Sequence, residues 1–282
     1  MSPVLMDGTA VSRRIVEQAA ADAAALTAET GVTPCLATVL VGADPASVTY
    51  VRMKQNRSAK AGIRSRHVEL PETATTADLV ATLTALSQDP DVHGILLQHP
   101  VPAPIDERAA FEAIAPAKDV DGVTMHSFAA MAFGEPGFVS ATPGGIMRLL
   151  DAYDVDPAGK HAVVVGRSPI LGKPVGMLLL ARNATVTYCH SKTADLAAHT
   201  RQADILVAAV GRPRFLTGDA VKPGAVVVDA GYNPGNVGDV DFASAAPKAG
   251  LITPVPGGVG PMTIAVLLEQ TVAAARGQLT RQ

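Results

Sequence analysis

The chain has 282 residues, with 23 Lys and Arg against 26 Asp and Glu, which gives a formal net charge of −3 at pH 7. Hydrophobic residues make up 48% of the chain and charged residues only 17%, so an intrinsically disordered protein is excluded. The near balance of charge argues against nucleic acid or an anionic membrane as the main partner. Because only 4% of the residues are aromatic and none is Trp, a base-stacking surface is not expected either.

Targeting and metal-binding signals are not visible in the sequence. No apolar run reaches the roughly 18 residues that span a bilayer, and the first residues lack the apolar core of a signal peptide. Cys35 and Cys189 are too few and too isolated to cross-link the fold, which favours a reduced, cytoplasmic compartment. The seven His residues form no HExxH motif or Cys/His cluster, so no metal site is predicted.

Strand-like and helix-like stretches alternate along the chain, which predicts parallel α/β sheets. In the first half, helices are expected at residues 11–28, 45–61 and 76–87, and strands at residues 35–41, 64–70 and 94–98. The periodicity fades over residues 119–145, where Gly and Pro recur, and we place a domain boundary there. Beyond it, strands buried on both faces are expected at residues 161–165, 185–189, 205–210 and 225–229. A last short strand is expected at residues 251–253 and a last helix at residues 261–276.

A candidate phosphate-binding loop lies in residues 161–174, where a buried strand leads to Gly166 and a helix begins near Pro174. Glycines at such a turn allow the free N–H groups of the helix to bind a pyrophosphate. The segment is not a Walker loop, since five residues rather than four separate Gly166 from Gly172. Ser168 replaces the second Gly of the standard dinucleotide motif. An ordinary glycine-bearing turn therefore remains an alternative.

The end of the next strand bears on cofactor choice. NAD enzymes carry an Asp or Glu there, which binds the ribose 2′-hydroxyl. Here Ser191 and Lys192 follow the strand, and Arg167 in the preceding loop could reach the same pocket. These groups suit a 2′-phosphate, so NADP is favoured over NAD. Alternatively, Ser191 and Lys192 cap a helix that begins near Thr193.

Tyr50 and Lys54 form a candidate catalytic pair, because residues four apart share one face of a helix. Desolvation beside an aromatic side chain lowers the pKa of a Lys, which can then exchange protons near neutral pH. By spacing alone, however, such a pair is more often an ordinary solvated surface.

The pair is accompanied by further motifs in a fixed order. They are Asp44-Pro-Ala-Ser47 with Tyr50 and Lys54, Gly94-Ile-Leu-Leu-Gln98-His-Pro-Val-Pro102, Lys118-Asp-Val-Asp121-Gly122, Ala141-Thr-Pro-x-Gly145, Gly166-Arg-Ser168 and Pro254-Val-Pro-Gly-Gly-Val-Gly-Pro-Met-Thr263. With these six motifs, nearly the whole chain closely resembles the bifunctional methylenetetrahydrofolate dehydrogenase/methenyltetrahydrofolate cyclohydrolase family.

The resemblance implies a role for each matched residue. Tyr50 would be the wall for the folate rings, and Lys54 the acid/base of the cyclohydrolase. Gln98 would support Lys54 by hydrogen bonding, and Asp121 would anchor the donor edge of the pterin. The NADP site would be lined by Gly166, Arg167, Ser168, Ser191 and Tyr232. The 256–261 loop, with Pro256, Gly257 and Gly258 as substrate-binding residues, would close over nicotinamide and pterin.

Three positions depart from the commoner family pattern. Asn56 stands where a second basic residue is usual, His99 where Leu is usual, and Ala141 where Cys is usual. None removes a proposed catalytic group. His99 adjoins Gln98, so we expect it to modulate the pKa of Lys54 without being essential, unless it simply faces the core.

Two α/β domains enclosing a cleft are therefore expected. Residues 1–138, with the returning C-terminal helix 263–282, would form the folate-binding catalytic domain, and residues 139–262 a Rossmann-like NADP-binding domain. The resemblance implies a homodimer that oxidises 5,10-methylenetetrahydrofolate with NADP⁺ and hydrolyses the methenyl product to 10-formyltetrahydrofolate. The alternatives are a dehydrogenase with weak or no cyclohydrolase activity, an amino-acid or quinate-type dehydrogenase, and a catalytically silent nucleotide-binding protein.

Overall fold

The computed structural model describes residues 3–42 and 54–280. The chain divides into two compact units, which we name by their sheets. The six-stranded unit comprises Met1–Arg13 and Ser140–Ala265, and the three-stranded unit comprises Arg14–Val139 and Val266–Gln282. Each unit contains one wholly parallel sheet with helices, which confirms the predicted two-domain α/β fold.

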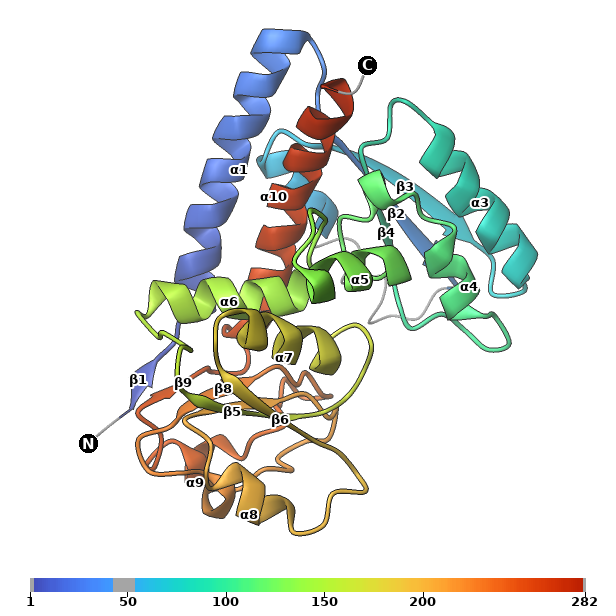
Figure 1. Ribbon diagram of the computed structural model, residues 1–282. Coiled ribbons are helices and arrows are strands. Elements are labelled where there is room, and N and C mark those ends of the chain that lie inside the picture. The colour runs from blue at the N-terminus through green and yellow to red at the C-terminus, as the bar shows by residue number, and fades with distance from the viewer. Residues whose placement is uncertain (1–2, 43–53, 281–282) are drawn as a thin grey trace. The chain divides into compact units, whose positions relative to one another are not determined.

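The six-stranded sheet has the order β1-β9-β8-β7-β5-β6. Its strands are β1 (Val4–Leu5), β5 (His161–Val165), β6 (Thr185–Cys189), β7 (Ile205–Ala208), β8 (Val226–Asp229) and β9 (Leu251–Ile252). The central strands consist mostly of Val, Ile, Leu and Ala and are buried on both faces, as expected for a parallel sheet covered by helices. Figure 1 shows α7 on one face of this sheet and α8 and α9 on the other.

The helices of this unit connect or flank the strands. They are α6 (Ala141–Ala152), α7 (Gly172–Ala181), α8 (Leu196–Thr200) and α9 (Phe242–Ala245), with a short 3₁₀ turn η2 (Gly218–Ala220). Gly176 of α7 lies directly over Tyr188 of β6, because a Cβ at Gly176 would fall 2.2 Å from the Tyr188 hydroxyl. The crossover helix is therefore held close to the sheet.

The three-stranded sheet has the order β3-β2-β4, with β2 (Cys35–Val41) in the centre, β3 (Arg64–Leu70) and β4 (Gly94–Leu97). β2 and β4 are fully buried, whereas β3 is a half-exposed edge strand, as its polar sequence predicts. Figure 1 shows α3 on one side of this sheet and α10 on the other.

The helices of the three-stranded unit include two long ones that continue from the other unit along the chain. These are α1 (Gly8–Thr30) and α10 (Val259–Leu279); the others are α3 (Thr76–Gln88), α4 (Glu107–Glu112) and α5 (Met125–Phe133), with a 3₁₀ turn η1 (Pro116–Lys118). Residues 54–60 are also helical, and Gly62, with a φ of +67°, follows them. The rest of the helix expected at residues 45–61 lies mostly outside the described residues.

Two helices, α5 and α6, occupy the stretch where the sequence periodicity fades. α5 begins because the Thr124 hydroxyl accepts a hydrogen bond from Ser127 N, and it ends at Gly134 in the left-handed conformation. α6 contains Pro143, Gly144 and Gly145 near its start, at the end of the stretch in which we place the domain boundary. A Cβ at Gly145 would lie 2.8 Å from Met262 Cβ, so the glycine permits close packing against α10.

The predicted domain limits at 138/139 and 262/263 stay a prediction. In the structure, β1 pairs in parallel with β9 through Val4 and Leu251, and the first residues are grouped with the six-stranded unit.

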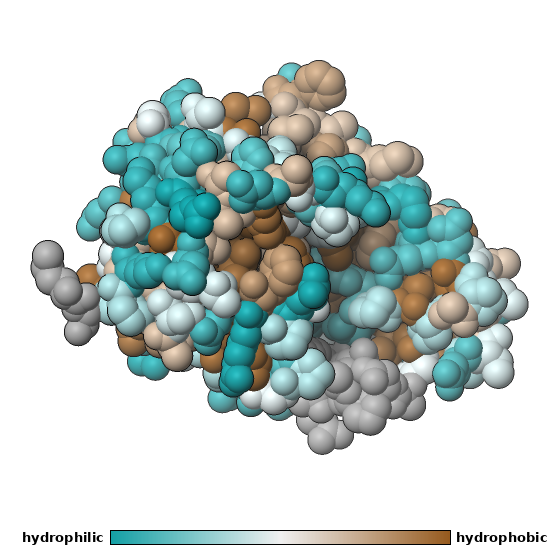
Figure 2. Space-filling view, turned by 90° about the horizontal axis from the view of Figure 1, so that it is seen from below, coloured by the Kyte–Doolittle hydropathy of each residue, from teal (hydrophilic) through white to brown (hydrophobic). Residues whose placement is uncertain are grey.

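None of the described helices is long and apolar enough to cross a membrane. On the face drawn in Figure 2, hydrophobic and hydrophilic side chains are interspersed, consistent with the modest share of charged residues.

Candidate active site

The candidate phosphate loop lies where parallel sheets usually bind ligands. β5 has β6 on one side and β7 on the other, so the chain reverses direction across the sheet at β5. Ligands bind beyond the carboxyl ends of the strands at such a switch point. Gly166 follows β5 directly with a φ of +137°, and a Cβ there would fall 2.2 Å from the Ala209 carbonyl oxygen, at the end of β7. Only glycine fits this position.

The loop after Gly166 is closed by Ser168. The Ser168 hydroxyl accepts hydrogen bonds from Leu171 N (3.1 Å) and Gly172 N (3.2 Å), and its carbonyl accepts one from Lys173 N (3.0 Å). Gly172 approaches Gly166 so closely that a Cβ would lie 2.6 Å from the Gly166 carbonyl group. The start of α7 is thus pressed against the end of β5, which brings the helix N-terminus to the switch point.

The groups expected to select the cofactor are solvent-accessible. Arg167, Ser191 and Lys192 are exposed and make no side-chain hydrogen bond to other described residues. The capping alternative for Ser191 and Lys192 is wrong, because the next helix, α8, is capped by Asp195, whose side chain accepts from Ala198 N. The Thr193 hydroxyl accepts from His190 N instead and closes a turn. Ser191 and Lys192 therefore remain available to a ligand.

Two buried carboxylates hold the loops that follow β7 and β8. Asp239 accepts hydrogen bonds from Val210 N, Gly211 N and Arg212 N at 2.6 to 2.9 Å. Asp229 accepts from Gly231 N, Asp239 N and Val240 N at 2.9 Å each. The strand predicted to reach Val210 ends earlier, at Ala208: Ala209 N still donates to the Val165 carbonyl oxygen, but the N–H groups from Val210 onward bind Asp239 instead of a neighbouring strand.

The remaining predicted cofactor and substrate residues lie in loops of the same unit. Tyr232 follows the Asp229 turn, is 53% exposed, and donates a hydrogen bond to Asn236. Pro256, Gly257 and Gly258 lie between β9 and α10. The Gly257 carbonyl accepts from Thr9 N (3.0 Å), and a Cβ at Gly258 would fall 2.5 Å from the Pro254 carbonyl oxygen, so this loop is tightly wound.

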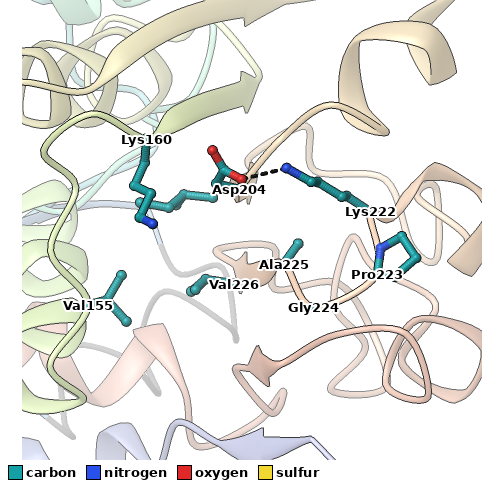
Figure 3. A pocket seen from close by; sticks show the side chains of 9 residues that line it. Val155, Lys160, Asp204, Lys222, Pro223, Gly224, Ala225 and Val226 are labelled. Atoms are coloured by element: carbon teal, nitrogen blue, oxygen red, sulfur yellow. Dashed lines mark hydrogen bonds and ion pairs between the residues drawn. The ribbon is translucent and has the colours of Figure 1, made fainter.

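A small hollow of about 160 Å³ lies at the opposite, amino-terminal edge of the six-stranded sheet (Figure 3). The Lys222 ammonium donates to Asp204 at 2.6 Å, while Lys160 reaches into the hollow from another side. Asp204 also accepts from His161 N. None of the predicted site residues lines this hollow, so it is separate from the switch point.

In the three-stranded unit, Lys54 and Gln98 meet at the carboxyl end of β4. Gln98 continues the sheet by donating its N–H to the Val39 carbonyl oxygen (2.8 Å). The Lys54 ammonium, from the first described turn of helix 54–60, donates to Gln98 Oε1 at 3.1 Å. The Gln98 amide donates in turn to the His99 carbonyl oxygen (3.0 Å), which fixes its orientation. Lys54 and Gln98 are thus in direct contact, while the role of Gln98 in supporting Lys54 stays a prediction.

Asp121 shares the electrostatic environment of Lys54. Burial lowers the pKa of the Lys54 ammonium, and the negative charge of Asp121 acts in the opposite direction. Burial raises the pKa of Asp121; the charges of Lys54 and His99 lower it, and Asp119 raises it further. Both shifts favour the neutral forms of the two groups. The Asp121 carboxyl makes no side-chain hydrogen bond to other described residues and can therefore accept one from a ligand.

The three departures from the family pattern have different surroundings. His99 is half-buried with its ring edge-on to Phe111 at 5.8 Å, and its charge acts on the pKa of Asp121. Asn56 is exposed on helix 54–60, and Ala141 is buried at the start of α6. Tyr50 lies outside the described residues.

Asp119 is a residue that the sequence analysis did not single out. It is fully buried, and its carboxylate accepts from Val123 N, Thr124 N and the hydroxyls of Thr124 and Ser127 at 2.6 to 3.1 Å. The sequence signal that could have revealed it is Asp119 followed by Thr124 and Ser127, a carboxylate and two hydroxyl residues of the kind found at the start of a helix. Among the described residues, no group of three or more His, Cys, Asp or Glu could hold a metal ion.

Comparison with protein families matches both parts of the chain. Residues 6–121 match the description "Tetrahydrofolate dehydrogenase/cyclohydrolase, catalytic domain", and residues 140–279 match "Tetrahydrofolate dehydrogenase/cyclohydrolase, NAD(P)-binding domain".

Individual relatives are similar over nearly their whole length. The chain is 77% identical over 275 residues to "Bifunctional protein FolD 1" of Streptomyces avermitilis, covering 98% of this chain and 96% of that protein. The crystal structure of the bifunctional FolD from Campylobacter jejuni superposes with a TM-score of 0.95 at 44% identity, covering 98% of this chain and 99% of that one. The Trypanosoma brucei FolD, complexed with NADP and an inhibitor, gives a TM-score of 0.95 at 36% identity, covering 99% of both. The chain therefore belongs to the tetrahydrofolate dehydrogenase/cyclohydrolase family.

Proposed function

We propose that this protein oxidises 5,10-methylenetetrahydrofolate to 5,10-methenyltetrahydrofolate with NADP⁺ and hydrolyses the product to 10-formyltetrahydrofolate. The observation that carries the proposal is the contact between Lys54 and Gln98 in a setting that lowers the pKa of the lysine. A lysine whose pKa is lowered gives up its proton more readily than a solvated one and can take part in the proton transfers of the hydrolysis.

The six-stranded unit fits a dinucleotide phosphate. A glycine-lined turn at the switch point, the N-terminus of α7 and the exposed Arg167, Ser191 and Lys192 provide N–H groups and positive charge, with no acidic residue at the end of β6 to repel a 2′-phosphate. Gly166, Ser168 and Tyr232 complete the proposed binding set. When bound, NADP⁺ supplies the hydride acceptor.

In the dehydrogenase step, the protein's residues bind and align the substrate. The lone pair of the folate nitrogen drives departure of the hydride, so no protein acid or base is needed. Asp121 would hold the donor edge of the pterin, Tyr50 would lie against the folate rings, and Pro256, Gly257 and Gly258 would contribute further substrate contacts.

In the cyclohydrolase step, the neutral amine of Lys54 accepts a proton from the water that attacks the methenyl carbon. The hydrogen bond that the amine donates to Gln98 Oε1 orients the nitrogen and leaves its lone pair free to accept this proton. Addition of the water oxygen is followed by cleavage of the bond between that carbon and N5. One proton of the water ends on N5 and the other is released, so Lys54 is regenerated.

The alternatives are distinguished by activity. A silent nucleotide-binding protein would turn over neither folate, and family membership argues against an amino-acid or quinate-type dehydrogenase. Reduction of NADP⁺ by 5,10-methylenetetrahydrofolate, followed spectrophotometrically beside the disappearance of the methenyl compound, tests both steps. Hydride transfer without hydrolysis would support the alternative of a dehydrogenase with weak or no cyclohydrolase activity.

Cofactor choice gives a separate prediction. If Arg167 contacts a 2′-phosphate, NADP should be preferred over NAD by roughly 2–3 kcal/mol, the scale of a hydrogen bond between charged groups. Arg167→Ala should then raise the KM for NADP far more than the KM for NAD, whereas the exposed Arg201→Ala should change neither. Equal effects on both cofactors would contradict the assignment.

A cytoplasmic homodimer is part of the same proposal. Cys35 and Cys189 are free and buried, as expected for a reduced compartment. In the six-stranded unit, Leu180 of α7 and Tyr188 of the edge strand β6 are 56% and 36% exposed on neighbouring elements, a place where a second copy can pack. Sedimentation at micromolar concentration should give twice the chain mass; a monomer there would exclude a stable dimer.

A further inference from the structure

Asp121 sits in a tight turn, so its position depends on how the backbone around it is held. Gly122 N donates to the Asp119 carbonyl oxygen (3.0 Å), which places Asp121 third in a four-residue turn. Gly122 has a φ of +64°, a conformation that favours glycine. Since the Asp121 carboxyl has no side-chain hydrogen bond among the described residues, its direction is set by this turn.

One side of the turn is fixed by Asp119. Its buried carboxylate binds Val123 N and Thr124 N, which directly follow the turn, and so ties them to the start of α5. This anchor is local in sequence. The Asp119 carboxylate does not bind the Val120–Asp121 peptide group, which must be held by another residue.

That peptide group is held by Gln270 of α10, a residue 150 positions away from Val120. The Gln270 side-chain amide donates to the Val120 carbonyl oxygen at 2.8 Å and to the Val139 carbonyl oxygen at 3.0 Å. Its own carbonyl accepts from Val139 N at 3.2 Å. Gln270 is only 9% exposed, so these three bonds are shielded from water.

Packing supports the same point. Val120 is fully buried, and its two methyl groups lie 2.8 and 2.9 Å from where a Cβ on Gly94 would be, beside the Thr271 hydroxyl of α10. Gly94 begins β4, the strand that Gln98 directly follows. Val120 is therefore wedged between α10 and the strand that carries the Lys54 partner, and Gln270 holds its carbonyl.

We propose that Gln270 is a positioning residue for Asp121: it fixes the Val120–Asp121 peptide group and so aims the carboxyl that binds the substrate. The inference rests on the proposed function. Misplacing such a group by about 1 Å can cost roughly 100-fold in rate, and binding groups need support to within about 0.5 Å. The charged groups facing Asp121 are Lys54, His99 and Asp119; Gln270 is neutral, so replacing it alters geometry rather than charge.

Gln270→Met tests the proposal, because methionine has a similar length but makes no comparable hydrogen bonds. We expect the kcat/KM for the folate substrate to fall by about 10-fold or more in both reactions, mainly through KM, with the KM for NADP unchanged. Activities are measured at a temperature at which thermal unfolding curves show each variant to be folded. A parental kcat/KM in the folded variant would overturn the proposal.

Gln278→Met is a matched control from the same helix. The Gln278 amide also donates to two backbone carbonyls of the three-stranded unit, those of His93 (2.8 Å) and Ala117 (3.1 Å), but it does not touch the Asp121 turn. Its substitution should lower stability with little change in folate KM. If both variants lost activity in proportion to their loss of stability, Gln270 would be a structural residue only.

A double-mutant cycle separates the action through Asp121 from any other. In an Asp121→Asn background, Gln270→Met should lower the kcat/KM for the folate substrate by less than about 3-fold, because the carboxyl that Gln270 positions has already been removed. Equal costs in both backgrounds would contradict the proposal. Should Gln270→Met fail to fold, Gln270→Glu replaces it in the cycle. The glutamate keeps an oxygen that can accept from Val139 N, and in its protonated form it also keeps one donor. The increase of its folate KM over that of the parent should therefore become smaller as the pH is lowered. An excess independent of pH would count against the proposal. Inactivity of the parent chain would instead refute the proposed function.

Discussion

Lys54→Met is expected to lower cyclohydrolase activity by roughly 10²–10⁴-fold, the usual contribution of a positioned acid/base, while dehydrogenase activity persists at a reduced level. Methionine retains much of the apolar stem of lysine, so the packing should survive. Hydride transfer takes no proton from this residue. In a coupled assay, the methenyl compound should therefore accumulate instead of passing on to the formyl product.

The pH dependence gives a second readout for Lys54. Because burial lowers the pKa of its ammonium, the neutral amine should be gained as the pH rises through a value below that of an ordinary lysine. Parental cyclohydrolase activity should rise over that range, and the rise should vanish in Lys54→Met. Lys60→Met, an exposed position on the same helix, serves as the control. Hydrolysis at the parental rate by Lys54→Met would show that the lysine is not the acid/base.

Asp121→Asn should lower both activities together, because both would use the same bound pterin. The substitution keeps the shape but replaces an anionic acceptor by a neutral amide, which weakens hydrogen bonds to ring N–H donors by about 1.5–3 kcal/mol, or roughly 10- to 150-fold in kcat/KM. Thermal stability should change little, since the carboxyl makes no side-chain hydrogen bond within the described chain. The exposed Asp91→Asn is the control.

The pH profile of Asp121→Asn should also change in a defined direction. Burial raises the pKa of Asp121, so the carboxyl takes up its proton at a higher pH than an ordinary Asp, and substrate binding should weaken as the pH falls through that value. Asparagine does not titrate, so this acid limb should disappear from both activities. Loss of only one activity would make Asp121 a catalyst of that step rather than an anchor.

The strands and most helices could be predicted because their signals are local. β2, β5 and β8 are short apolar runs, and Gly166 marks the sharp turn that only glycine fits. By contrast, α5 and α6 were missed because their evidence is tertiary: Gly145 reads as a helix breaker until Met262 is seen packed against it. The capping alternative for Ser191 and Lys192 likewise failed because Asp195, a few residues later, captures the helix start.

The candidate site divides in the same way. Lys54, Gln98 and Asp121 could be named from motifs, and the structure adds the 3.1 Å contact between the first two. Gln270 could not be found, since a glutamine on a long helix carries no local signature of the two distant carbonyls that it binds. The roles of the cofactor loop residues stay predictions, to be decided by the Arg167 variant.

The pairing of β1 with β9 limits how much of the six-stranded sheet can form while the chain is being synthesised. Val4 is synthesised well before its partner Leu251, because all the other strands of the sheet lie between them along the chain. The strand β1 therefore lacks its neighbour in the six-stranded sheet until β9 has been made. The three-stranded unit also waits, because Gln270 and the rest of α10 are needed to fix Val120. Neither unit can be completed before β9 and α10 have been synthesised, so the growing chain needs protection from misassembly until then.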